Sequence, residues 1–172
     1  MHSGLVEQVN QKKLNETLDY YIRECNISDI AEYQSDLYCL MLESLSSSYD
    51  DQCININVKI EQLKQYLSND QAKVFAAFHD AKMIGFLWAY QVVFLDKSRL
   101  HISQYAVHEN YRSMQIGRHL LRAVEDHARS IGIDTLELVV SEKNQTAKDI
   151  YQHFQFVNER IIMRKYLGKH YD

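Results

Sequence analysis

The stretch that decides the fold is YAVHENYRSMQIGR, residues 105–118. Partly alternating apolar residues predict a strand over residues 100–107, and apolar residues at steps of three and four predict a helix over residues 116–131 that ends at Gly132. The quoted stretch is therefore a strand-to-helix turn. Such a turn directs backbone N–H groups outward, where the positive end of the helix dipole helps them to bind phosphate oxygens. Spacing alone also allows an ordinary structural turn.

The residues after this helix predict a second, parallel strand. Residues 135–140 read TLELVV, and they follow the helix after a short connection. A strand, a helix and a strand joined in this way normally place the two strands parallel in one sheet. Beyond them the sequence predicts a helix that starts after Asn144, a strand near Phe156 and another strand over residues 161–167.

The residues before this unit predict antiparallel strands and two helices. We expect a strand over residues 20–23, a helix from about Asn26 to residues 46–48, a second helix over residues 56–67, and a hairpin formed by residues 74–78 and 83–94. The expected fold class is α/β (α+β), a mixed and mostly antiparallel sheet with helices on both faces. Residues 20–172 are expected to form a single domain, and residues 1–19 a short helix or an arm.

The composition indicates a folded protein with ordinary charge. Of the 172 residues, 46% are hydrophobic, and the net charge of -4 argues against a nucleic-acid-binding role, which needs a basic surface. Cys25, Cys39 and Cys53 match neither a disulfide framework nor a zinc motif, so we expect reduced thiols and no metal. No signal peptide or membrane-spanning run is recognisable, and these features together predict a cytoplasmic location and no membrane partner.

The motifs, in their order along the chain, resemble those of the GCN5-related N-acetyltransferase (GNAT) family. The family signature Gln/Arg-x-x-Gly-x-Gly/Ala is similar to Arg112-x-x-Gln115-x-Gly117. The later family pattern of Asn, Ala, Tyr and Gly-Phe resembles residues 144–156, with Asn144, Ala147, Tyr151 and Gln155-Phe156. Gln115 and Gln155 stand where the family usually has glycine, and Gln115 raises the question of weakened coenzyme binding.

The resemblance implies acetyl transfer from acetyl-CoA to a primary amine by direct attack in a ternary complex. It implies a splayed pair of parallel strands, a Val107 N–H that holds the thioester carbonyl, and Tyr151 as the acid that protonates the leaving thiolate. Without the family, Tyr151 reads as a core residue and Asn144 as a helix cap. The implied coenzyme-binding residues are Tyr105, Ala106, Val107, Arg112, Ser113, Met114, Gln115, Ile116, Gly117, Arg118 and Asn144.

The sequence leaves the general base and the acceptor open. His101, Glu137, His79 and a water relay are all candidates for the base. Residues 1–98 carry an excess of acidic residues, which favours a cationic amine as acceptor. The family resemblance also allows a homodimer. The alternative functions are a non-catalytic acyl-CoA-binding or regulatory module, and an interaction domain without a coenzyme site.

Overall fold

The computed structural model describes residues 18–46, 55–163, 165 and 167. The chain divides into two compact units, Met1–Val139 and Val140–Asp172. Most of the expected arm at residues 1–19, the loop around residues 50–51 and Cys53 lie outside the described residues.

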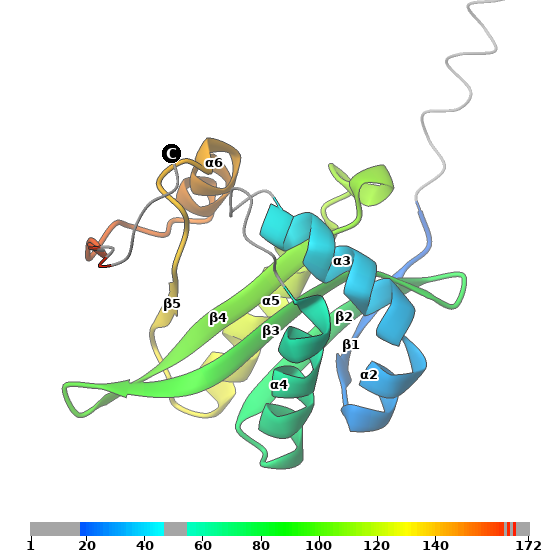
Figure 1. Ribbon diagram of the computed structural model, residues 1–172, viewed down its shortest axis with the longest axis horizontal. Helices are drawn as coiled ribbons and strands as arrows, with labels where there is room; N and C mark the ends of the chain where they lie inside the picture. Colours follow the sequence, from blue (N-terminus) through cyan, green and yellow to red (C-terminus); the bar gives the residue numbers. More distant parts are fainter. Residues whose placement is uncertain (1–17, 47–54, 164, 166, 168–172) are drawn as a thin grey trace, which may run out of the picture. The chain divides into compact units, whose positions relative to one another are not determined.

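The first unit is a five-stranded sheet with helices on both faces (Figure 1). Its strands lie in the order β1-β2-β3-β4-β5; β4 and β5 are parallel and all other neighbours are antiparallel. The expected fold class is confirmed. The elements of this unit are β1 (Tyr21–Cys25), α2 (Ile27–Glu32), α3 (Gln34–Ser46), α4 (Ile56–Ser68), β2 (Ala72–His79), β3 (Lys82–Phe94), β4 (Lys97–Val107), the 3-10 helix η1 (Glu109–Tyr111), α5 (Ile116–Ser130) and β5 (Leu136–Leu138).

The region predicted as one helix, from about Asn26 to residues 46–48, forms two helices, α2 and α3, so the expectation of one helix is wrong. Asn26 caps α2 by accepting from the N–H groups of Ser28 and Asp29, and the Asp29 carboxylate accepts from the Asn26 N–H in return. The chain then bends at Tyr33, whose ring packs edge-on against Phe78 with the centroids 4.9 Å apart. Tyr33 keeps the helical spacing of the apolar residues, so the sequence pattern could not show that the helix is interrupted there.

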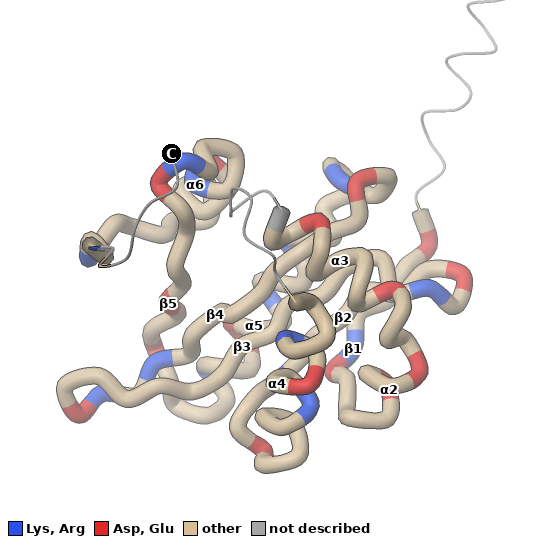
Figure 2. The backbone as a smooth tube through the Cα atoms, viewed as in Figure 1, with Lys and Arg blue, Asp and Glu red and all other residues tan. Residues whose placement is uncertain are grey.

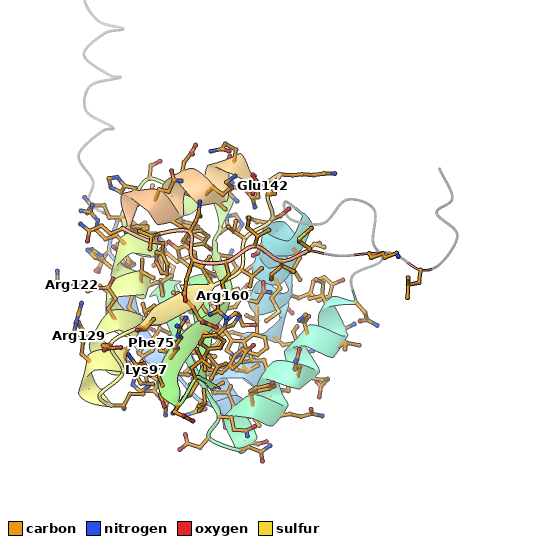
Figure 3. All side chains as sticks on the ribbon, turned by 90° about the vertical axis from the view of Figure 1, so that its left-hand side faces the viewer. Phe75, Lys97, Arg122, Arg129, Glu142 and Arg160 are labelled. Carbon is orange, nitrogen blue, oxygen red and sulfur yellow. The ribbon has the colours of Figure 1, made fainter. Side chains whose placement is uncertain are left out.

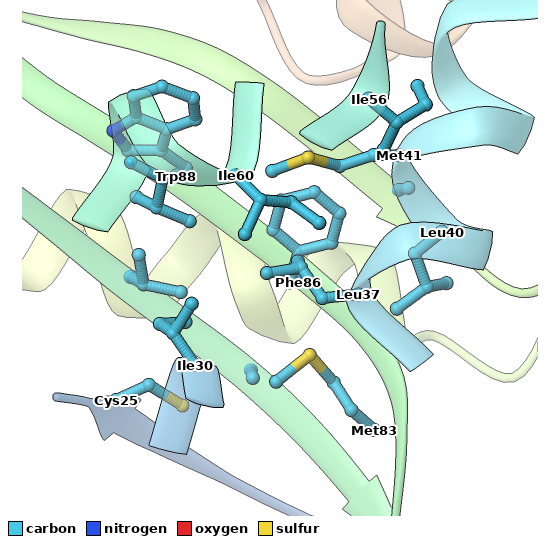
Figure 4. Packing of buried hydrophobic residues seen from close by; sticks show 14 of the residues in the cluster. Cys25, Ile30, Leu37, Leu40, Met41, Ile56, Ile60, Met83, Phe86 and Trp88 are labelled. Atoms are coloured by element: carbon cyan, nitrogen blue, oxygen red, sulfur yellow. The ribbon is translucent and has the colours of Figure 1, made fainter. Parts of the chain in front are cut away.

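The larger core lies between the sheet and the layer formed by α2, α3 and α4. Figure 4 shows Phe86 and Trp88 of β3 among side chains of the helices, which include Leu37, Met41 and Ile60. The strand from Met83 to Phe94 carries no charged residue, and Figure 2 shows it as an uncharged band between helices and turns that carry charges. This composition suits a strand that is covered on both faces.

The helix α5 covers the opposite face of the sheet. Its apolar residues Ile116, Leu120, Leu121, Val124 and Ala128 are buried. A Cβ at Gly85 of β3 would lie 3.3–3.4 Å from side-chain atoms of Leu120 and Ile116, so the glycine allows close packing of α5 on β3. Gly132, with φ 74°, ends this helix as expected, and Ile133 N donates to Ala128 O at 2.8 Å.

The second unit contains α6 (Gln145–His153) and an extended tail. The strand predicted at residues 135–140 is shorter than expected, because β5 covers only Leu136–Leu138. The two strands predicted near Phe156 and over residues 161–167 are absent from the described residues there, which have no pairing partner. Val157, Ile161 and Met163 are exposed, so their strand-like pattern is not matched by a buried surface.

The buried thiol of Cys25 predicts a loss of stability at alkaline pH. Cys25 is 2% exposed, and burial raises the pKa of its thiol to about 12 from the ordinary value of 9.0. The folded state therefore binds this proton more tightly than the unfolded state, and the stability it contributes is present below pH 9 and is lost between pH 9 and 12. Urea unfolding should show an added loss that approaches about 1.4 kcal/mol per pH unit above pH 9.

A Cys25→Ala variant should not show the added loss of stability above pH 9. The difference in unfolding free energy between the wild type and Cys25→Ala should therefore shrink as pH rises. Cys39, which is exposed, provides the matched control. Parallel curves for the wild type and Cys25→Ala from pH 8 to 11 would contradict the prediction.

Candidate functional site

The parallel pairing of β4 with β5 ends early. It joins Leu100 to Leu136, His101 to Glu137, and Ile102 to Leu138, while β4 continues to Val107. Within the described part of the chain, residues 103–107 of β4 therefore have a strand partner on the β3 side alone. An edge of this kind can pair with the amides of an extended ligand as an added strand would.

The backbone of Val107 points toward that edge. His108 N donates to Ile84 O at 3.0 Å beside the Gly85–Val107 pair, which makes this a non-hydrogen-bonded pair of the antiparallel ladder. The N–H and C=O of Val107 consequently point away from β3. This direction is the one required of the N–H that the sequence assigns to a thioester carbonyl.

The turn between β4 and α5 contains two residues with left-handed backbone. Ser113 has φ 67° and Gln115 has φ 61°, and Gln115 is the N-cap of α5. Its side chain makes no capping hydrogen bond, so it does not occupy the first turn of the helix as Asn26 does in α2. The turn retains the left-handed backbone that glycine usually supplies at such positions.

Gly117 is required by a close contact with Tyr105. A Cβ built on Gly117 would collide with the Tyr105 hydroxyl oxygen and would lie 3.2 Å from Cζ of the same ring. Tyr105 and Val107 therefore face the first turn of α5, since the same Cβ would also lie 3.7 Å from Val107 Cγ2. The sequence singled out Gly117 for the phosphates, whereas the structure gives it a packing role as well.

Arg112 fastens the turn to the sheet and to α3. Its Nε donates to Val107 O at 3.2 Å, and its Nη2 lies 3.2 Å from Oε2 of Glu43. The guanidinium of Arg112 is thus engaged by Val107 and Glu43. Ser44, next to Glu43, donates from its hydroxyl to Tyr105 O at 3.4 Å, which adds a second tie between α3 and β4.

A tyrosine–histidine pair that the sequence did not indicate supports the same turn. The Tyr20 hydroxyl lies 2.5 Å from His119 Nδ1 and donates to Met114 O at 3.5 Å. These residues are more than 90 positions apart, so no local spacing could have connected them. Tyr20 and His119 line an open hollow of about 580 Å³, together with Ile22, Arg122, Ala123 and Asp126.

The remaining arginines of α5 differ in environment. Arg122 and Arg129 are exposed and stand on the outer side of the helix in Figure 3, and Arg129 pairs with Glu125 and Asp126. Both side chains belong to a solvated face of the helix. Arg118 and Ile116 lie in the first turn of α5, where the sequence expects the coenzyme phosphates.

In the second unit, Asn144 and Tyr151 have well-defined local roles. Asn144 is the N-cap of α6, and its Oδ1 accepts from Ala147 N at 3.0 Å. Burial raises the pKa of the Tyr151 phenol to about 12, so this phenol holds its proton more tightly than an exposed tyrosine does. Tyr151 also packs against Phe156, with ring centroids 5.6 Å apart.

Gln155 ends α6 in the conformation that glycine usually supplies. It has φ 67°, its N–H donates to Gln152 O at 2.9 Å, and Phe156 N donates to Tyr151 O at 2.9 Å. This is a Schellman motif with glutamine at the left-handed position. The helix α5 ends in the same motif with Gly132 at that position.

The candidates for the general base fall into two places. His101 and Glu137 are paired across β4 and β5, with Nδ1 and Oε1 3.2 Å apart. His79 lies at the end of β2, and its Nδ1 is 2.7 Å from Asp19 O.

Ala106, the remaining residue of the predicted strand end, is buried in the core on the α3 side.

The part of the chain that the structure describes holds neither a metal-binding cluster nor a membrane-spanning helix. In residues 18–46, 55–163, 165 and 167 there is no group of three or more His, Cys, Asp or Glu residues that could hold a metal ion. No helix in the same residues is long and apolar enough to cross a membrane.

The fold and these motifs agree with comparisons to known proteins. Residues 35–156 match the model of the Acetyltransferase (GNAT) family, and the chain belongs to this family. The sequence is 29% identical over 89 residues to the uncharacterized N-acetyltransferase YycN of Bacillus subtilis (strain 168), a match that covers 52% of this chain and 57% of that protein. The chain thus spans about half the length of the curated relatives it matches.

Solved structures share the fold at low sequence identity. A predicted acetyltransferase from Clostridium acetobutylicum, solved with acetyl-CoA, has a TM-score of 0.72 at 15% identity and covers 90% of this chain and 100% of its own. An aminoglycoside acetyltransferase from an uncultured soil metagenomic sample, solved with sisomicin, has a TM-score of 0.68 at 19% identity and covers 87% of this chain and 97% of its own. These likenesses confirm the fold.

The left-handed backbone at Gln115 predicts that glycine stabilises the protein there. Gln115→Gly should raise the free energy of unfolding by about 0.5–1 kcal/mol, because glycine adopts positive φ without steric cost and this gain exceeds its greater chain entropy. The matched control is Gln65→Gly on the exposed side of α4, where helical backbone should make the same change destabilising by about 1 kcal/mol. Urea unfolding measures both, and equal signs would contradict the prediction.

The contact between Gly117 and Tyr105 predicts a coupled pair. Gly117→Ala should cost about 1–2 kcal/mol of stability in the wild type, because the added methyl group displaces the Tyr105 ring. The cost should fall when the hydroxyl is removed first by Tyr105→Phe. A double-mutant cycle of unfolding free energies measures the coupling, and additive effects would show that the two residues do not meet.

Proposed function

We propose that the protein is an acetyl-CoA-dependent N-acetyltransferase that acetylates a primary amine by direct attack in a ternary complex. The observation that carries the proposal is the edge of β4 beyond Ile102, which leads to the outward-facing first turn of α5. An edge that can pair with amides, followed by a turn that can bind phosphates, suits the pantetheine arm and pyrophosphate of coenzyme A. Membership of the GNAT family supports the same assignment.

The residues take these roles in the proposal. Backbone N–H groups of Ser113, Met114, Gln115, Ile116, Gly117 and Arg118 bind the pyrophosphate, while Tyr105, Ala106 and Val107 form the wall along the pantetheine arm. The Val107 N–H stabilises the carbonyl oxygen as it gains charge. Tyr151 donates its phenolic proton toward the thiolate as it leaves, which stabilises the negative charge that develops on the sulfur. Arg112 holds the turn before α5 in place, and Asn144 caps the helix that carries Tyr151.

The acceptor in the proposal is a cationic amine. The acidic excess in residues 1–98 supports this class, which includes polyamines, amino sugars, aminoglycosides and peptide amino groups. One similar protein was solved with the aminoglycoside sisomicin, which is a cationic amine. We further propose a cytoplasmic location, which is supported by the free thiols of Cys25 and Cys39.

Isothermal titration with acetyl-CoA tests the coenzyme site. We expect micromolar binding, and we expect Met114→Glu to weaken it at least about tenfold, because the new carboxylate would face the phosphates from an exposed position in the turn. Val58→Glu, at another exposed apolar position, on α4, should leave the affinity unchanged and is the matched control. Absence of binding to the wild type would refute the proposal.

Turnover separates catalysis from binding alone. Release of free coenzyme A should be measured with spermidine, glucosamine, sisomicin and a lysine-containing peptide with a free N-terminus. Binding without release on every amine would favour a non-catalytic acyl-CoA-binding module. Equal rates on these amines and on neutral ones would remove the support for a cationic acceptor.

A further inference from the structure

The hydroxyl group of Tyr20 lies between two acceptors from different parts of the fold. It is 2.5 Å from Nδ1 of His119, near the start of α5, and 3.5 Å from the carbonyl oxygen of Met114, in the turn before that helix. The Tyr20 ring also stacks on the His119 ring, with the centroids 6.0 Å apart. A hydroxyl group has one proton to donate, so it cannot serve both acceptors fully at the same time.

The charge of His119 decides which acceptor receives this proton. An uncharged imidazole with its lone pair on Nδ1 accepts the proton, and the shorter of the two distances agrees with this state. A charged imidazole has protons on both ring nitrogens, so Nδ1 then donates to the hydroxyl oxygen and the hydroxyl proton turns to Met114 O. Imidazole is the side chain whose charge changes between about pH 5 and 8. The pair can therefore convert a change of pH into a change of hydrogen bonding in the turn.

The Met114 carbonyl belongs to the same peptide group as the N–H of Gln115. This group is planar and trans, so a hydrogen bond that holds the carbonyl on the Tyr20 side directs the N–H to the opposite side. A hydrogen bond to the carbonyl also polarises the N–H of the same peptide group. The Gln115 N–H is one of the donors that the proposed function assigns to the pyrophosphate. Tyr20 thus acts on this donor through Met114.

The hollow beside His119 is open to solvent and contains charges of both signs. The titratable and charged groups that line it with His119 are Tyr20 from the segment before β1, and Arg122 and Asp126 from α5, while β1 contributes the uncharged Ile22. The Asp126 carboxylate pairs with Arg129 at 3.1 Å. Because His119 itself is exposed, it can take up a proton from solvent without a rearrangement of the sheet or of α5.

We propose that Tyr20 is a positioning residue for the coenzyme-binding turn and that the charge of His119 controls it. This assignment rests on the proposed function, because it requires a coenzyme contact at the Gln115 N–H. Protonation of His119 moves the Tyr20 proton to Met114 O and holds the Gln115 N–H toward the pyrophosphate. It also adds a positive charge near the start of α5, where a helix favours anions. Protonated His119 therefore strengthens the binding of acetyl-CoA.

The first test follows the turn in the coenzyme-free protein by NMR. In the wild type, the carbonyl ¹³C shift of Met114 should titrate with the same midpoint as the ring nitrogens of His119. Tyr20→Phe keeps the ring and removes the hydroxyl group, so it should abolish this response while His119 still titrates. His127→Gln changes a histidine of α5 that packs on Phe75; it is the matched control and should leave the response unchanged. A Met114 carbonyl that does not follow His119, or that still follows it in Tyr20→Phe, would overturn the proposal.

The second test measures the affinity for acetyl-CoA by isothermal titration at pH 6 and pH 8. The 3′-phosphate of the ligand titrates in the same range, so the wild type is compared with His119→Gln at each pH. Glutamine gains no charge, and we expect the two proteins to agree within about twofold at pH 8, whereas the wild type should bind about three- to tenfold more tightly at pH 6. The ratio of the wild-type and His127→Gln affinities should be the same at both pH values.

The outcomes separate this proposal from the proposed function. A wild type that binds acetyl-CoA, with the same affinity ratio to His119→Gln at pH 6 and pH 8, overturns the role of His119 and leaves the proposed function standing. A wild type that binds no acetyl-CoA at either pH overturns both proposals, because the turn then has no coenzyme to position.

Discussion

The short parallel contact between β4 and β5 is the constraint on which the candidate site depends. The helix α5 joins the two strands and covers one face of the sheet, so the strands must run in the same direction. Their pairing nevertheless lasts for three residue pairs only. A longer ladder would satisfy the backbone of residues 103–107 internally, and an extended ligand would then have no strand to pair with.

Two glutamines keep the left-handed backbone conformation at positions where the family usually has glycine. Gln115 and Gln155 both have positive φ, and both stand where the family has glycine. The hydrogen bonds around each remain those of an N-terminal turn and a Schellman ending. A strained residue persists when the surrounding structure fixes its backbone, and here packing of α5 on the sheet and of Phe156 on Tyr151 provides that restraint. The loss of glycine therefore does not by itself change the backbone conformation of either turn.

The sequence predicted the parts of the fold whose signals are local. The periodicity of residues 116–131 and the capping residue Asn144 were sufficient for α5 and for the start of α6, because helix faces and caps depend on neighbours within four residues. The break at Tyr33 and the contact of Tyr20 with His119 depend on residues far apart in the chain, so no spacing could show them. The same holds for Glu137 and His101, which become partners only through the β4–β5 register.

A β-bulge explains why the alternation along β4 looked imperfect, and it arranges the site. Trp88 pairs with Gln104 and Ala89 pairs with Ile102, so Ser103 is an extra residue. Without it, the period of two would place His101 and Tyr105 on the same face of the sheet. With it, His101 packs on Tyr90 on the face covered by α4, while Tyr105 faces Gly117 of α5. One inserted residue thus directs His101 and Tyr105 to opposite faces of the sheet, His101 toward α4 and Tyr105 toward α5, while both remain on the same strand.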